Sequence, residues 1–183
     1  MNAELVSSES GARSPWPRPL LQETDHRIPG AHWVNPLRTL PIGGCMRTRE
    51  SVTRAFASLP GSVGAARRLA GETLEDWGLA RAVEDVRLVV SELVGNACRH
   101  AVPEGTDPSA LPVVVRFSLL PEPGTVACLV ADSSSTAPNR VDAHHFAESG
   151  RGLGLVAAFS RDWGWKPLQG GGKVVWAICE ENA

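Results

Sequence analysis

The sequence predicts an α+β fold, a two-layer α/β sandwich in which helices cover one face of a mixed, largely antiparallel sheet. Two helical patterns follow one another between residues 62 and 101, and two Val-rich strand patterns follow at 112–120 and 125–131. The short, turn-rich sequence Leu-Pro-Glu-Pro-Gly joins those strands and favours a hairpin. Consecutive strands joined by a short turn exclude an all-parallel sheet. The class is therefore α+β, with helices on one face of the sheet.

The chain of 183 residues has the length of one domain with a tail. Residues 1–49 contain six of the 14 prolines and show no sustained period, which predicts a disordered or extended segment. Residues 50–183 are expected to form the folded domain. Trp16 and Trp33 leave two alternatives for the tail, loose packing on the domain or a short partner-binding element. Met46 lies where the composition changes, so a start there is also open.

The charge balance argues against partners that are held by charge alone. Eighteen Lys and Arg against 20 Asp and Glu give a formal net charge of -2, so we expect no direct binding of nucleic acid. Arg67, Arg68 and Arg81 form too small a cluster to change this expectation. The sequence also lacks an apolar run of membrane-span length and the apolar core of a signal peptide, so we expect a soluble, cytoplasmic protein without membrane contact.

The first half of the domain predicts a strand followed by two helices. Residues 52–56 alternate weakly and predict an edge strand. Apolar residues then recur at helical spacing from a candidate N-cap, Ser62, to a candidate stop at Gly78. A second, longer helix is expected at 80–101, ended by Pro103.

The second half of the domain continues beyond the hairpin with a long loop. Residues 133–149 are polar and aperiodic, which is typical of a lid or binding loop. A Gly-rich turn at 150–154 is expected to open a third helix that runs to about Trp163. Residues 172–179 predict the final strand.

Three polar residues form a stripe along the edge of the buried face of the second helix. Glu92, Asn96 and His100 differ by only about 40° per step around an ideal helix. A carboxylate, an amide and an imidazole in this order could accept a proton, ligate Mg²⁺ and contact a phosphate. The alternative is that boundary positions of an amphipathic helix are polar without a function.

Asp132 ends the second hairpin strand and opens the long loop. Its carboxylate could accept a hydrogen bond from the exocyclic amine of adenine, which would select adenine over guanine. Because Asp-Ser is ordinary turn composition, a simple turn-forming role is the alternative.

The segment from Gly150 to Leu155 places three glycines at alternate positions before a helix. Backbone N–H groups and the helix N-terminus could approach an anion there, with the Arg151 side chain available for charge. The G-x-G-x-x-G motif fails because Leu155 occupies its last position, and the P-loop motif fails at Gly172-Lys173. Phosphate binding is therefore one hypothesis for this turn.

Taken in order, these pieces resemble a known nucleotide site. Its parts are Glu92-x-x-x-Asn96-Ala97-x-x-His100, then Asp132, the loop, the turn at 150–155 and Gly172-Lys173-Val174-Val175-Trp176. They resemble the N, G1, G2 and terminal boxes of the gyrase, histidine-kinase and MutL-type ATPases. More narrowly, residues 50–180 resemble the bacterial anti-sigma-factor serine kinases and their actinobacterial relatives. The resemblance implies a histidine-kinase-like ATPase fold.

The resemblance implies a site for ATP and Mg²⁺. Asp132 would accept the adenine amine, Asn96 would hold Mg²⁺ against the phosphates, and Glu92 would act as general base toward an attacking serine hydroxyl. Other residues would shape the phosphate end, namely His100, Gly150, Arg151, Gly152, Leu153 and Gly154. At the adenine end, the corresponding boxes carry Ser134, Lys173 and Val174.

Two departures from the family pattern weaken the expected adenine contacts. Ser134 stands where the family usually has Gly, and Val174 stands where it usually has Thr. Losing one hydrogen bond costs about 1 kcal/mol, or several-fold in affinity, so nucleotide binding could survive.

The resemblance implies a regulatory kinase whose partners are a sigma factor, an anti-sigma-factor antagonist or both, with a homodimer as a possibility. The alternative is a non-catalytic protein-binding module with a weak or degenerate nucleotide site. A sensor histidine kinase fragment has little support, because residues 1–49 are too rich in proline for phosphoacceptor helices.

Overall fold

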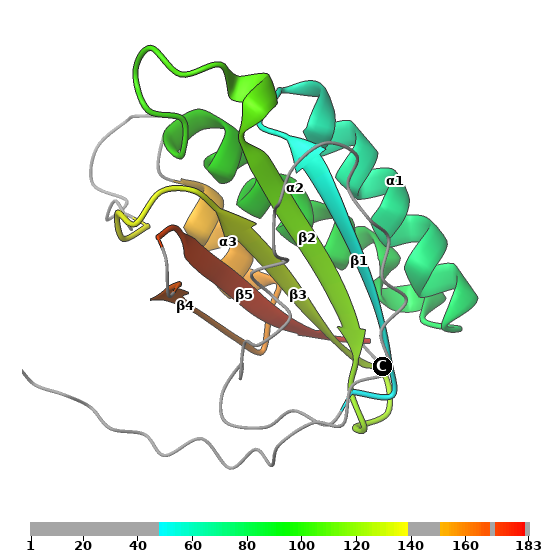
Figure 1. Ribbon diagram of the computed structural model, residues 1–183. Helices are drawn as coiled ribbons and strands as arrows, with labels where there is room; N and C mark the ends of the chain where they lie inside the picture. Colours follow the sequence, from blue (N-terminus) through cyan, green and yellow to red (C-terminus); the bar gives the residue numbers. More distant parts are fainter. Residues whose placement is uncertain (1–47, 139–150, 169–170, 182–183) are drawn as a thin grey trace, which may run out of the picture.

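A computed structural model describes residues 48–138, 151–168 and 171–181. Within these residues, five strands form one sheet in the order β1-β2-β3-β5-β4, and every described pairing is antiparallel (Figure 1). The strands are β1 (Glu50–Ala57), β2 (Pro112–Leu119), β3 (Thr125–Asp132), β4 (Asp162–Pro167) and β5 (Lys173–Glu180).

Three helices pack on one face of this sheet (Figure 1). They are α1 (Gly61–Asp76), α2 (Val83–His100) and α3 (Arg151–Ala158), with single 3₁₀ turns η1 (Ala80–Ala82) and η2 (Pro108–Ala110). α2 contacts both α1 and α3 as well as β3, so it forms the centre of the helix layer. The predicted α+β fold is confirmed. We expected a mixed, largely antiparallel sheet, and all the described pairings are antiparallel.

The main core lies between the helices and the sheet. α2 contributes Val86, Val89, Val90 and Leu93, whose spacing places them on one helix face and whose exposed fractions are 0–3%. They belong to the same cluster as alternate residues of the strands, including Val113, Val115, Phe117, Val126, Cys128 and Val130. Because this alternation has a period of two, the residues between them point to the other face of the sheet.

The third helix is shorter than the sequence predicts. α3 ends at Ala158, and Trp163 belongs instead to β4, where it pairs with Ala177 of β5. Trp163 and Trp165 are separated by one residue, which fits the pleat of a strand. Pairing with β5 therefore decides the structure of this segment, and the expectation of a helix up to Trp163 was wrong.

The start of α1 also differs from the prediction. The helix begins at Gly61 after Pro60, and no side chain caps it. The Ser62 hydroxyl instead donates to the Ala57 carbonyl at 2.6 Å, so it ties the helix to the end of β1. The predicted stop is confirmed, since Gly78 has a φ of 73°, a conformation that favours glycine.

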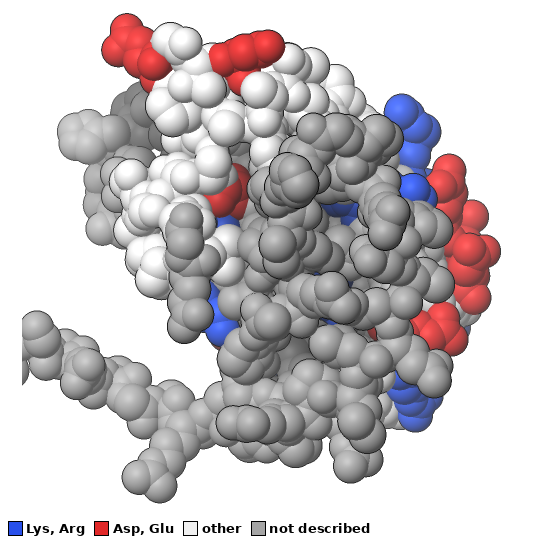
Figure 2. All heavy atoms as spheres, in the orientation of Figure 1, with Lys and Arg blue, Asp and Glu red and all other residues white. Residues whose placement is uncertain are grey.

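The described surface carries charges of both signs. Figure 2 shows basic and acidic side chains close together along the edge of the molecule that α1 forms. The exposed residues of α1 include Arg67, Arg68, Glu72, Glu75 and Asp76. No helix in the described ranges combines the length and the hydropathy that a bilayer span requires.

Candidate functional site

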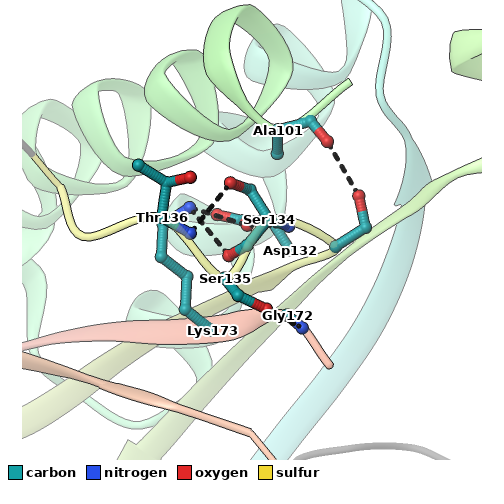
Figure 3. Close-up of polar contacts among 8 residues, drawn as sticks. Ala101, Asp132, Ser134, Ser135, Thr136, Gly172 and Lys173 are labelled. Carbon is teal, nitrogen blue, oxygen red and sulfur yellow. Dashed lines mark hydrogen bonds and ion pairs between the residues drawn. The ribbon is translucent and has the colours of Figure 1, made fainter. Parts of the chain in front are cut away.

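The ends of β3 and β5 bring Asp132 and Lys173 together. These two residues are register partners, and the Lys173 ammonium donates to Oδ1 of Asp132 at 2.9 Å (Figure 3). Their side chains point toward the helix layer, because Val130 and Val175, two residues away on the same strands, belong to the core beneath the helices. The ion pair is buried, with side-chain exposed fractions of 4% for Asp132 and 8% for Lys173.

Ser134 closes the turn that follows β3. Its backbone N–H donates to Oδ1 of Asp132 at 2.9 Å, and its carbonyl accepts from the Lys173 ammonium at 3.2 Å. Its hydroxyl accepts from the backbone N–H of Thr136 at 3.2 Å (Figure 3). A side chain is therefore compatible with this turn, at the position where the resemblance expects glycine.

Two further hydrogen bonds fix this turn against its neighbours. The Ser133 hydroxyl donates to the carbonyl of Ala101 at 2.8 Å, immediately after α2 (Figure 3). The Ser135 hydroxyl accepts from the backbone N–H of Gly172 at 3.1 Å. The turn that follows Asp132 is thus attached to the C-terminal end of α2, the helix that carries Glu92, Asn96 and His100.

The pKa of Asp132 reflects two opposing influences. Burial raises the pKa above its ordinary value, because removal from water disfavours the carboxylate. The Lys173 ammonium and the Ser134 N–H favour the carboxylate and oppose this rise. Both groups bind Oδ1, and no described residue donates to Oδ2, so Oδ2 is the oxygen that can accept a ligand donor.

α2 and the start of α3 form the second part of the site. Glu92 and Asn96, one turn apart on α2, are both half-buried. A methyl group placed on Gly152 would lie 2.6 Å from Oε2 of Glu92 and 3.6 Å from Oδ1 of Asn96. The structure therefore brings the carboxylate, the amide and the N-terminal turn of α3 together, and glycine at 152 leaves room for the carboxylate.

Arg99 is a participant that the sequence interpretation missed. Its guanidinium donates to Oδ1 of Asn96 at 2.9 Å, across one turn of α2. Side chains three residues apart on a helix are neighbours, and this spacing was the available signal. Because Arg99 is exposed, water competes for its guanidinium, and its hydrogen bond to Asn96 is worth little in stability.

The remaining residues of the predicted phosphate end lie in different environments. His100 is the last residue of α2 and is exposed. Leu153 is 4% exposed and its side chain packs into the core, so only its backbone could contact a ligand at the N-terminal turn of α3. Gly154 is exposed. Gly150 lies outside the described residues, as does the side chain of Arg151, and so do residues 139–149 of the predicted lid.

Val174 lies on the opposite face of the sheet from Asp132. It is fully buried in a second apolar cluster together with Ala131 and Ile178. Strand alternation explains this placement, because Lys173 and Val175 take the helix side of β5. The side chain that meets Asp132 is Lys173, and Val174 is not positioned to contact a base held there.

The described residues contain no cluster of three or more His, Cys, Asp or Glu side chains able to hold a metal ion. The Asn96 amide oxygen is a group that can ligate a hard cation together with oxygens of a bound ligand. Mg²⁺ accepts such an arrangement, since it commonly uses one or two protein ligands plus substrate phosphates.

The family is shown by comparison with protein-family models. Residues 56–179 match the model of the histidine kinase-like ATPase domain, which is more than half of the chain. The protein belongs to this family, and its domain is of a kind that binds ATP. No protein of curated function matches the chain.

The fold is shared with a solved structure. The RsbU and RsbW domains of Rv1364c from Mycobacterium tuberculosis superpose with a TM-score of 0.54 at 19% identity, covering 73% of this chain and 33% of that one. The histidine kinase domain of the blue-light activated histidine kinase EL346 from Erythrobacter litoralis gives a TM-score of 0.42 at 16% identity, with 69% and 62% covered. The match thus spans about a third of the mycobacterial chain in that structure.

Proposed function

We propose that the protein is an ATP-binding regulator that transfers the γ-phosphoryl group of ATP to a serine of a protein partner. The observation that carries this proposal is the convergence of Glu92 and Asn96 with Gly152 at the N-terminus of α3. This places a proton acceptor and an amide beside backbone N–H groups that attract anions. Phosphoryl transfer needs mainly such positioning and charge compensation.

Asp132 is the proposed recognition residue for adenine. Oδ2 can accept the hydrogen bond that the exocyclic amine of adenine donates, whereas guanine would present a carbonyl oxygen to the carboxylate. The ammonium of Lys173, bound to Oδ1, keeps the neighbouring carboxylate charged and in place. Because the pair is buried, one hydrogen bond to the charged oxygen contributes about 1.5–3 kcal/mol.

Asn96 is the proposed ligand of Mg²⁺. The ion, when bound, would neutralise charge on the phosphates. Asn96 contributes its amide oxygen once Arg99 has turned away, and the released guanidinium is then free to face the phosphates. Gly152 and Gly154 keep the N-terminal turn of α3 clear of side chains, so its backbone N–H groups remain accessible.

Glu92 is the proposed general base. Its carboxylate lies at the edge of the buried face of α2, next to Gly152, where the serine of a partner can approach from solvent. In this role it accepts the hydroxyl proton as the serine oxygen attacks the γ-phosphorus. The partner class that we propose is an anti-sigma-factor antagonist, with a sigma factor as a second, non-phosphorylated partner and a homodimer as the assembly.

A phosphotransfer assay with Glu92→Gln tests this proposal. With Mg-ATP and candidate antagonist proteins, the wild type is expected to form phosphoserine. Glu92→Gln should lower the rate about 10²–10⁴-fold, because it loses the proton acceptor, while the Kd for Mg-ATP stays within a few-fold. The matched control is Glu104→Gln, at an exposed loop position. An unchanged rate in Glu92→Gln would exclude its role as base.

Gly152→Ala is expected to disturb the site without unfolding it. The new methyl group would lie 2.6 Å from Oε2 of Glu92, so the carboxylate must move, and a misplacement of about 1 Å can cost about 100-fold in rate. Because the contact is to the end of a flexible side chain, the free energy of unfolding should change by less than about 1 kcal/mol. Gly61→Ala, which meets no atom within 4 Å, is the control. Equal rates in the two variants would contradict the proposed arrangement.

A second candidate function is a non-catalytic module that binds a regulatory protein. It is favoured by the hydrogen bond from Arg99, which already occupies the Asn96 Oδ1 that Mg²⁺ would need. The Asp132 carboxylate likewise already has an ion-pair partner in Lys173. In that case partner binding persists in Asn96→Ala, as measured by titration calorimetry with and without Mg-ATP. Loss of partner and nucleotide binding together would favour the nucleotide-dependent regulator.

A further inference from the structure

The face of the sheet that points away from the helices, here called the outer face, is apolar and buried. Its side chains alternate along the strands with those of the main core. Seven residues form the apolar cluster, all with exposed fractions of 0–3%, namely Val114, Leu120, Ala127, Leu129, Ala131, Val174 and Ile178. All three described helices lie on the opposite face (Figure 1), so they do not account for this burial.

Arg116 gives a second sign that the outer face is covered. It lies on the outer side of β2, paired across the strands with Thr53 and Leu129, and it is only 5% exposed. Its guanidinium donates to the Ser51 hydroxyl at 3.0 Å. Arginine is rarely buried on an open surface, because its long side chain reaches water easily. Other atoms must therefore lie over the outer face.

The chain outside the described residues offers one segment of suitable size. Residues 1–47 directly precede β1, whose Thr53 and Ala55 belong to the outer face. Crossing five strands requires about 19 Å at strand spacing, and far fewer than 47 residues span that distance. The other undescribed segments have 12 residues or fewer.

The composition of this segment fits an apolar face. Residues 1–47 contain Trp16, Trp33, Ile28 and Val34 with several leucines, which are side chains that an apolar face can bury. A tryptophan removes about 150–250 Å² from water when it is buried. Frequent proline favours an extended chain, which can lie across a sheet without helix or strand of its own.

We propose that residues 1–47 bind across the outer face of the sheet as an intramolecular cover, with Trp16 and Trp33 as its anchors. The cover packs on the surface formed by β1, β2, β3 and β5, on the opposite side from Asp132 and Lys173. It replaces the second helix layer that this two-layer fold lacks, and it prevents two copies from meeting through this apolar face.

Photo-cross-linking in the full chain tests the cover. A benzoylphenylalanine at position 53 points to the outer face, whereas one at position 54, the exposed Arg54, points to the other side of the same strand. Irradiation at low micromolar concentration should cross-link position 53 within the monomer, to peptides from residues 1–47, at least five-fold more than position 54. A covalent dimer, a cross-link to residues 139–150 or equal yields at both positions would overturn the proposal.

A measurement on the wild type removes any dependence on the variant's folding. Hydroxyl-radical footprinting of the monomer should oxidise Leu129 and Ile178 as slowly as the core residue Leu74, and Trp33 more slowly than the exposed Trp165. Oxidation of Leu129 at the rate of the exposed Leu59 would mean that the outer face is open, and would overturn the proposal.

Discussion

Lys173→Met is expected to lower the free energy of unfolding by about 3–5 kcal/mol at neutral pH, in the absence of nucleotide. The substitution removes the ammonium that lies 2.9 Å from Oδ1 of Asp132 and leaves a buried carboxylate without its ion-pair partner. The Ser134 N–H alone remains to stabilise the charge. Urea unfolding followed by circular dichroism measures the difference.

The pH dependence of this loss has a defined sign. Burial already raises the pKa of Asp132, and removal of Lys173 eliminates the main influence that opposes the rise. The folded variant then binds the proton more tightly than the unfolded chain does, so its free energy of unfolding increases as the pH falls through the raised pKa. The difference in free energy of unfolding between wild type and Lys173→Met should therefore be greatest above that pKa and become smaller in acid.

The double variant Asp132→Leu with Lys173→Met is the control for the buried ion pair. It removes both charges, and replacing a buried pair by apolar side chains is often neutral or stabilising. We expect it to recover most of the stability that Lys173→Met loses and to lack the acid-dependent recovery. A double variant as unstable as Lys173→Met at every pH would show that packing, and not charge, causes the loss.

Gly172→Ala is expected to destabilise the fold by more than about 3 kcal/mol, through backbone strain and steric overlap together. Gly172 has a φ of 84°, which side chains rarely adopt, and its added methyl group would lie 2.3 Å from the carbonyl oxygen of Asp132. Because that oxygen belongs to the backbone of β3, it can move only by shifting Asp132 itself. Thermal unfolding should show the loss as a decrease on the order of 10 °C.

Gly171→Ala separates the two causes. Gly171 has a φ of 105° but meets no atom within 4 Å, so its substitution introduces backbone strain alone, about 1–3 kcal/mol. Gly172→Ala should therefore be clearly less stable than Gly171→Ala. Equal losses in the two variants would show that the close approach of Gly172 to the Asp132 carbonyl is unimportant.

The helical part of the fold and its polar stripe could be predicted because the signal is local. The spacing of Val86, Val89, Val90 and Leu93 defines the buried face of α2, and Glu92 and Asn96 then follow at its edge. The structure adds the partner element, because only tertiary packing shows that Gly152 of α3 approaches both side chains.

The Asp132–Lys173 pair could not be predicted from either residue alone. Their proximity depends on the antiparallel register of β3 with β5, which connects residues 41 positions apart. Asp132 was a candidate from its place at a strand end, whereas Lys173 drew attention only through a motif. The resemblance directed attention to Val174 as well, although strand alternation places its side chain on the outer face.

β4 shows how a short strand is missed. The helical pattern of α3 extends for only eight residues, and the following Trp163 was assigned to the same helix. The alternation of Trp163 and Trp165 was the local signal for a strand, but a single alternation does not distinguish the two periods. Pairing with β5, which the sequence does not reveal, settles the structure.

Equilibrium binding of Mg-ATP and Mg-GTP to wild type and Asp132→Asn tests the central claim most directly. Titration calorimetry, at a temperature where circular dichroism shows both proteins folded, should give a Kd for ATP at least ten-fold below that for GTP. Asp132→Asn should weaken ATP binding about 10–100-fold, because the adenine amine loses its hydrogen bond to a charged acceptor. No binding of either nucleotide at millimolar concentration, or an ATP affinity unchanged in Asp132→Asn, would contradict an adenine site at Asp132.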